Sequence, residues 1–265
     1  MQVHQASLST VLKYLETEGQ RPLEVYERDF RKLLRLVSRF HPLGAGTRLL
    51  EVGIGTGWFL VMCAKKGLEC VGLDISRELI DFVRERAAQN GVRLDLRLGN
   101  IEETALDRGA FDVVIAESVF EHVEDWRRGL ANVAASLSPG GVLIFCSTNR
   151  FSPWSGEFPK LPLYGWLPNR IRYWLRRTLE GPDVMRLGID FHQFTYGTVR
   201  RALQETGFSR VYDIADLLDP ERLNQPTWWK ATSTSETTTS SSRSRGGRAI
   251  RAIPARSGAS RTSSS

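Results

Sequence analysis

The sequence predicts an α/β protein with a doubly wound, mostly parallel sheet of Rossmann-like architecture, and three observations support this prediction. Short apolar runs alternate with helical patterns from residue 24 to residue 215. A glycine-rich turn follows the first of these runs, within Leu49–Trp58. An acidic residue, Asp74, closes the second run. Together these features describe the edge of an open sheet where an adenosine-containing cofactor binds.

Each predicted element follows from a local pattern. Apolar residues at helical intervals predict an amphipathic helix over 24–40. Ser76 is placed to cap a helix that Asn90-Gly91 ends. The same reasoning predicts strands over 47–52, 69–73, 94–98, 111–116, 142–147 and 210–215, with helices over 58–66, 77–89, 123–136 and 195–205.

Length and composition divide the chain into three parts. With 265 residues it can bury one core and carry a lid and a tail. We predict an N-terminal segment (1–23), a domain (24–230) with a lid inserted after the fifth strand (150–195), and a disordered C-terminal tail (231–265). Seventeen of the last 35 residues are Ser or Thr, so the tail cannot bury enough surface to fold alone.

Charge is concentrated in that tail. Six arginines and one glutamate give it +5 of the total +6, so residues 1–230 carry about +1. A nearly neutral body argues against a specific nucleic-acid partner. The chain has no apolar run of eighteen residues, no secretory pattern at its start and three cysteines without metal-like spacing. These observations predict a cytoplasmic protein with reduced thiols.

The glycine turn indicates which cofactor binds. A dinucleotide-binding turn has its third glycine where this chain has Trp58, and a large indole there opposes the close helix–strand approach. Glu51 places negative charge beside the turn, which suits a cation better than a pyrophosphate. S-adenosylmethionine carries a sulfonium and an ammonium and no phosphate, and Asp74 can accept hydrogen bonds from both ribose hydroxyls. We therefore expect S-adenosylmethionine as the cofactor.

Five segments in order carry a resemblance to a known family. They are LLEVGIGTG (49–57), VGLD (71–74), LGNIEE (98–103), FDVVIAESVFEHVED (111–125) and LSPGGVLIFCSTNR (137–150). Over roughly residues 25–215 the chain resembles the class I S-adenosylmethionine-dependent methyltransferases, and most of all the group with the ubiquinone-biosynthesis O-methyltransferases. That fold has a seventh strand antiparallel to the fifth, which the sequence after residue 215 does not reveal.

The resemblance implies roles for the cofactor-binding residues. Gly53, Gly55 and Gly57 would line the methionine half of the cofactor, and Asp74 would bind its ribose. The remaining contacts are assigned in the same way: Ile75 to adenine, Asn100 and Ile101 to the adenine amino edge, and Glu117, after Ala116, to the methionine ammonium. Asn100 departs from the usual Asp, but its side-chain carbonyl can still accept the hydrogen bond.

Methyl transfer to a hydroxyl is helped by a general base, and His122 is our candidate. By the resemblance it lies near the transferred methyl; the alternative is that it lines the pocket wall without transferring a proton. Glu117, Glu121 and His122 also suggest a divalent metal, but the first Glu is offset by one place from the metal-binding relatives. We favour no metal.

The sequence gives less information about the residues that would bind the methyl acceptor. Asp190 and His192 are candidate substrate contacts, or a helix-cap region that packs Phe191 and Phe194. Aromatic residues and arginines over 153–177 suggest a lid, a lid that also contacts the inner membrane surface, or packing. The predicted activity is O-methylation of a small-molecule or lipid- or glycan-linked acceptor. The alternatives are an RNA or DNA base methyltransferase and a non-catalytic S-adenosylmethionine-binding protein; the sequence leaves the oligomeric state open.

Overall fold

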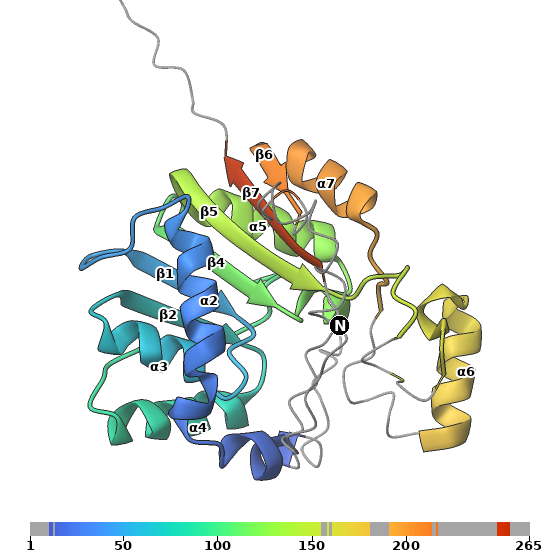
Figure 1. Cartoon of the computed structure of the whole chain (residues 1–265), viewed down its shortest axis with the longest axis horizontal. Helices are drawn as coiled ribbons and strands as arrows, with labels where there is room; N and C mark the ends of the chain where they lie inside the picture. The colour runs from blue at the N-terminus through green and yellow to red at the C-terminus, as the bar shows by residue number, and fades with distance from the viewer. Residues whose placement is uncertain are drawn as a thin grey trace, which may run out of the picture.

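A seven-stranded sheet forms the centre of the protein in the computed structural model (Figure 1). The structure describes residues 11–12, 14–154, 158, 161–180, 191–213, 216 and, by their backbone, 248–254. The strands are β1 (Arg48–Val52), β2 (Glu69–Asp74), β3 (Asp95–Leu98), β4 (Phe111–Glu117), β5 (Leu137–Ser147), β6 (Phe208–Tyr212) and β7 (Arg248–Pro254). Their order is β3-β2-β1-β4-β5-β7-β6, with β1 to β5 parallel and β7 antiparallel to both of its neighbours.

Helices cover both faces of this sheet. The α-helices are α2 (Glu27–Ser38), α3 (Trp58–Lys65), α4 (Arg77–Gln89), α5 (Trp126–Ser136), α6 (Asn169–Glu180) and α7 (Tyr196–Glu205). Shorter turns are η1 (Leu15–Gly19), η2 (Leu23–Tyr26), η3 (Phe120–His122) and η4 (Tyr164–Trp166). In the part of the chain that the structure describes, none of these helices is long and apolar enough to cross a membrane.

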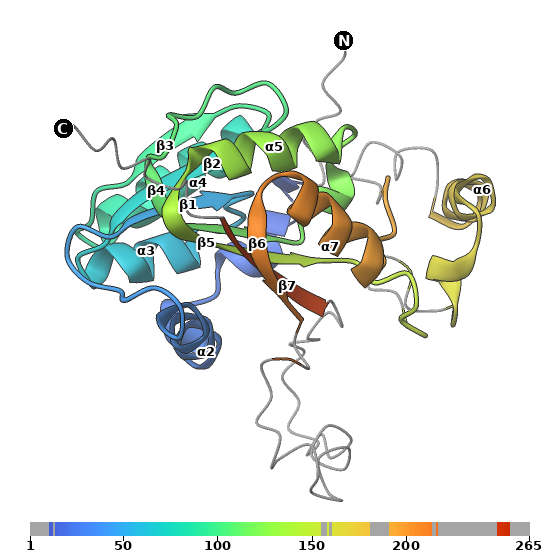
Figure 2. The same ribbon diagram turned by 90° about the horizontal axis from the view of Figure 1, so that it is seen from above.

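Two apolar clusters show how the layers are built. One joins β1 and β2 to α2, α3 and α4 through residues such as Phe30, Phe59 and Val83. The other joins β4 and β5 to α5 and α7 through residues such as Leu130 and Val199. The sheet is therefore the middle of three layers, with α2 and α5 on opposite faces (Figures 1 and 2). By contrast, α6 stands apart from the sheet (Figure 1).

The predicted fold class is confirmed, and α4 has the predicted bounds with the Ser76 hydroxyl accepting from Leu79 N. The helix predicted over roughly 123–136 is present as α5, but it begins at Trp126. Asp125 caps α5 by accepting from Arg128 N at 3.1 Å, and the preceding residues form the separate turn η3. His122 consequently belongs to η3.

The C-terminal edge differs from the prediction that the whole of 231–265 is a tail outside the fold. Residues Arg248–Pro254 form β7, the antiparallel strand that the sequence did not reveal, with Phe145 paired to Ile250. Insertion of β7 satisfies the backbone groups that would otherwise be exposed along the edge of β5. Residues 231–247 and 255–265 lie outside the described residues.

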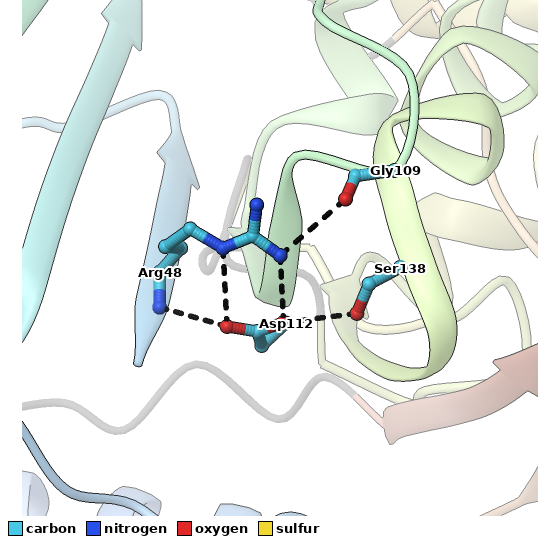
Figure 3. A network of polar contacts seen from close by, with 4 residues as sticks. All are labelled: Arg48, Gly109, Asp112 and Ser138. Carbon is cyan, nitrogen blue, oxygen red and sulfur yellow. Dashed lines mark hydrogen bonds and ion pairs between the residues drawn. The ribbon is translucent and has the colours of Figure 1, made fainter. Parts of the chain in front are cut away.

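A polar network joins β1 and β4 at the amino ends of the parallel strands (Figure 3). The Asp112 carboxylate accepts from Arg48 Nη2 at 3.1 Å, from Arg48 N at 3.0 Å and from Ser138 Oγ at 2.9 Å. Arg48 also donates to the Gly109 carbonyl. These bonds fix the pairing of β1 with β4, and the chain reverses its strand order between these two strands. Ligands of open α/β sheets bind at the carboxyl ends of strands at such a point.

Candidate functional site

The loop between β1 and α3 requires glycine at three positions. Gly53, Gly55 and Gly57 all have positive φ, at 73°, 51° and 68°. A Cβ at Gly53 would lie 2.3 Å from Val119 Cγ2, and one at Gly57 would lie 2.5 Å from Val83 Cγ1. Any side chain would therefore displace the loop from the structures around it. The result is a cradle of bare backbone at the carboxyl ends of the strands, which a ligand can approach closely.

Trp58 is the first residue of α3, and its ring stacks on Tyr26 with the centroids 4.9 Å apart. The indole thus packs against the turn before α2. Close approach between helix and strand is provided by Gly72 of β2 instead, where a Cβ would lie 2.8 Å from Leu60 Cδ1 of α3. The sequence reasoning did not identify this role of Gly72.

Glu51 is a buried carboxylate at the base of the cradle, and its side-chain oxygen Oε2 has no hydrogen-bond partner among the described residues. Burial raises the pKa of Glu51 well above its ordinary value, and the charges of Glu117 and Asp74 add to this effect. A buried carboxylate without a partner is costly. A cationic ligand would provide the missing partner, so this observation fits the ammonium of S-adenosylmethionine.

Asp74, at the end of β2, ties the cradle to α4. Its Oδ2 accepts from Ile54 N at 3.0 Å, and its Oδ1 accepts from Ser76 N at 2.9 Å. Burial raises the pKa of Asp74, whereas these backbone hydrogen bonds act in the opposite direction. The backbone N–H groups of Gly55 and Ile75 act on Asp74 in the same direction as these hydrogen bonds, so the carboxylate is fixed at the edge of the cradle where the ribose is expected. Ile75, the expected adenine contact, is half-buried beside it.

The predicted adenine-edge residues follow β3. Asn100 Oδ1 accepts from Glu102 N at 3.0 Å, which forms a local turn and leaves one lone pair for another donor. The Ile101 side chain is buried in the core, and its carbonyl accepts from Asn132 Nδ2 at 2.8 Å. The side chain of Ile101 is therefore part of the core, and its backbone N–H is the group that a ligand could use.

The segment after β4 carries the catalytic candidate. Glu117 is exposed at the end of the strand, and Ser118 has φ of 56°, a backbone conformation that non-glycine residues rarely adopt. This left-handed residue turns the chain sharply, with Ser118 N donating to the Cys146 carbonyl. His122, half-buried, follows at the end of η3. Strained residues of this kind are common at functional sites.

Glu121 and His192 brace this segment. The buried Glu121 accepts from Ser147 Oγ at 2.5 Å, and its carbonyl accepts from His192 N at 3.3 Å. The His192 ring nitrogen Nε2 lies 2.9 Å from the Glu124 carbonyl. Because a carbonyl oxygen can only accept, Nε2 is the protonated nitrogen. His192 is thus brought to the His122 segment, whereas Asp190 lies outside the described residues.

A metal site was considered for Glu117, Glu121 and His122. Across the described ranges, no group of three His, Cys, Asp or Glu side chains could hold a metal ion. The hydrogen bond from Ser147 to the buried Glu121 gives that carboxylate a structural partner.

One functional candidate was missed from the sequence. Arg86 of α4 is 8% exposed and donates to the Thr56 carbonyl of the cradle at 2.9 Å. No local pattern distinguishes Arg86 from the exposed arginines of the same helix, because its burial depends on an N-terminal segment some 65 residues earlier.

Comparison with known proteins shows which proteins this chain resembles. A family described as "Methyltransferase domain" matches residues 50–145. The ubiquinone biosynthesis O-methyltransferase of Coxiella burnetii (strain Dugway 5J108-111) is 35% identical over 105 residues, which are 40% of this chain and 45% of that protein. The chain thus spans about half the length of the curated relatives that it matches.

Solved structures share the fold. An S-adenosylmethionine-dependent methyltransferase from Mesorhizobium loti has a TM-score of 0.55 and 23% identity, covering 83% of this chain and 96% of that one. A Haemonchus contortus N-methyltransferase, in complex with phosphomonomethylethanolamine and S-adenosylhomocysteine, has a TM-score of 0.55 and 16% identity, covering 91% of this chain and 59% of that one. The chain therefore matches a methyltransferase-domain family over residues 50–145, and its fold is that of S-adenosylmethionine-dependent methyltransferases.

Proposed function

We propose that this protein transfers a methyl group from S-adenosylmethionine to an oxygen of a small-molecule or lipid- or glycan-linked acceptor. The observation that carries the proposal is the buried Glu51 carboxylate, whose Oε2 has no hydrogen-bond partner among the residues that the structure describes. It lies beside a bare glycine cradle at the point where the strand order reverses. The similarity to ubiquinone biosynthesis O-methyltransferases supports oxygen as the acceptor atom.

The residues of the cradle would bind and orient the cofactor. Glu51 neutralises an ammonium, Asp74 receives the ribose hydroxyls, and the glycine backbone admits the ligand at close range. Bound S-adenosylmethionine supplies a methyl group on a positively charged sulfur. The acceptor oxygen attacks the methyl carbon as the carbon–sulfur bond breaks, which leaves S-adenosylhomocysteine, a methyl ether and a proton. Fixed orientation of the two reactants accounts for much of the rate of such a displacement.

His122 is the proposed acceptor of that proton. It follows the strained turn at Ser118, on a segment held by the Glu121–Ser147 hydrogen bond and by His192. Such bracing fixes the position of the imidazole relative to the cofactor loop, because Val119 of the same segment packs on Gly53. If His122 only lines the wall, its removal will change acceptor affinity more than turnover.

The surface of α6 supports an acceptor that is attached to lipid. Trp174 is 63% exposed and Leu179 is 62% exposed, and the exposed Arg170 and Arg177 lie one turn on either side of Trp174. The opposite side of α6 is anchored by the buried Arg172, whose guanidinium lies 5.5 Å from the centre of the Tyr164 ring. Apolar and aromatic side chains flanked by arginines suit the surface of an anionic membrane.

Two experiments test the proposal. Incubation with labelled S-adenosylmethionine and fractionated lipid and metabolite extracts should transfer label to an acceptor in a linkage with the stability of a methyl ether. His122→Ala should lower kcat by about 10²-fold while cofactor binding stays unchanged. Cofactor binding without transfer to any fraction would support the non-catalytic alternative, and label in RNA or DNA would support the base methyltransferase.

Membrane contact is tested separately by sedimentation with vesicles that contain phosphatidylglycerol. The variant with both Trp174→Ser and Leu179→Ser should lose sedimentation. Leu98→Ser is the matched control, because Leu98 is 43% exposed on β3 at the far edge of the sheet. Equal sedimentation of all three proteins would contradict the proposed membrane surface.

A further inference from the structure

The N-terminal segment Tyr14–Arg21 lies against the cofactor loop and α4. A Cβ at Gly55 would lie 3.0 Å from the Tyr14 hydroxyl oxygen, so this phenol is directly above the middle glycine of the cradle. A Cβ at Gly19 would lie 3.0 Å from Phe82 Cζ of α4. The segment therefore touches the cofactor loop at one end and the adjoining helix at the other.

Arg86 holds this segment in place. From its buried position on α4 it donates to the Thr56 carbonyl in the cradle, to the Gly19 carbonyl at 3.4 Å and to the Arg21 carbonyl. Its guanidinium also lies 5.5 Å from the centre of the Phe82 ring. A single side chain thus joins the cofactor loop to the N-terminal segment by charge-assisted hydrogen bonds.

Burial of the segment itself does not explain this arrangement. None of the residues of η1 is buried, and Tyr14 is 38% exposed. A segment with so little buried surface depends on specific polar contacts for its position. Those contacts pass through Arg86 to the same loop that the cofactor would occupy, so the position of the segment and the occupancy of the loop are coupled.

We propose that segment 14–21 covers the cofactor site, that Tyr14 is a further cofactor-binding residue, and that Arg86 is the residue that positions them. The inference rests on the proposed use of S-adenosylmethionine. Since Glu51 at the start of the same loop suits an ammonium, the amino-acid end of the ligand lies here. The carboxylate at that end can accept a hydrogen bond from the Tyr14 hydroxyl.

The test measures cofactor binding, which is independent of methyl transfer. Titration calorimetry with S-adenosylhomocysteine should show about threefold to tenfold weaker binding for Tyr14→Phe, as expected for loss of one hydrogen bond. Arg86→Met should weaken binding by about tenfold or more. Arg84→Met is the matched control, because Arg84 lies on the same helix but is exposed and pairs with Asp81; it should bind as the wild type does.

Hydrogen exchange supplies a second readout. S-adenosylhomocysteine should slow exchange in residues 14–21 of the wild type, and Arg86→Met should remove that protection. Unchanged dissociation constants in both Tyr14→Phe and Arg86→Met, with no ligand-dependent protection, would overturn the inference. If Arg86→Met fails to fold, Tyr14→Phe and the wild-type exchange decide the result. A wild type that binds S-adenosylhomocysteine but never methylates would refute the proposed function and leave this inference standing.

Discussion

Replacement of Glu51 by Gln is the perturbation whose consequences the structure defines most fully. The substitution keeps the shape of the side chain and removes a buried charge. Burial raises the pKa of Glu51, with Glu117 and Asp74 adding to the effect, so the folded, ligand-free protein holds a proton that the unfolded chain has released. The free energy of unfolding of the wild type must therefore fall as pH rises from the ordinary carboxyl pKa towards the raised one.

The size of this pH dependence follows from the number of protons that the folded state holds and the unfolded chain does not. One proton held by the folded state alone gives a slope of about 1.4 kcal/mol per pH unit across that window, and the slope disappears above the raised pKa. Asp74, whose pKa burial also raises, contributes in the same direction in both proteins. The difference in slope between wild type and Glu51→Gln therefore isolates Glu51, and urea unfolding at a series of pH values measures it.

The affinity for the cofactor should rise with pH, whereas the free energy of unfolding falls. A cationic ligand stabilises the ionised form of Glu51, so wild-type affinity should fall as pH is lowered through the raised pKa, by about tenfold per pH unit. Glu51→Gln should bind roughly 10- to 150-fold more weakly above that pKa, as expected for loss of one charge-assisted contact. Calorimetry with S-adenosylmethionine measures both effects. Equal affinities and parallel pH profiles in the two proteins would refute the assignment of Glu51 to the ammonium.

Three further substitutions test other contacts. Asp74→Ala should weaken S-adenosylmethionine binding by about 1.5–3 kcal/mol in calorimetry, and unchanged affinity would mean that the ribose lies elsewhere. Gly57→Ala should lower the free energy of unfolding by about 1–3 kcal/mol more than Gly91→Ala, because both glycines have φ of 68° but only Gly57 faces Val83. If urea unfolding shows the same loss of free energy in both variants, the contact with Val83 is not the cause. Burial acts to raise the pKa of Asp112, but hydrogen bonds from Arg48 hold this pKa below its ordinary value. The ionised carboxylate therefore stabilises the folded protein at pH values above the pKa of the unfolded chain. This stabilisation is lost as pH falls through the lower pKa of the folded protein. Asp112→Asn should show a shallower loss of stability in acid, and an unchanged acid limb would contradict the role of the network.

The sequence predicted what is encoded locally. The strand β1, the glycine turn and the start of α3 follow one another directly in the sequence, and Asp74 closes the neighbouring strand. The cradle therefore follows from short-range patterns. Ser76 also caps its helix as expected, because capping involves residues three apart. Most of the fold, including the glycine turn and the acid that closes the second strand, could be predicted from the sequence for this reason.

What the sequence did not predict depends on distant partners. The strand β7 pairs with a segment about a hundred residues earlier, and its seven residues form too short a pattern to distinguish it from the Ser- and Arg-rich chain around it. Arg86 resembles any helix arginine until the N-terminal segment covers it. The burial of the Ile101 side chain also depends on a distant partner, since Gly129 lets α5 approach it closely. In each case tertiary packing decided the outcome.

The central claim is that the cradle between β1 and α3 binds S-adenosylmethionine. The most direct test is a calorimetric titration of the purified chain with S-adenosylmethionine, S-adenosylhomocysteine and NAD⁺. The account predicts one saturable site per chain for the first two ligands, mutual competition between them, weaker binding of both in Asp74→Ala and no binding of NAD⁺. Absence of binding by S-adenosylmethionine, or binding of NAD⁺ in competition with it, would contradict the account.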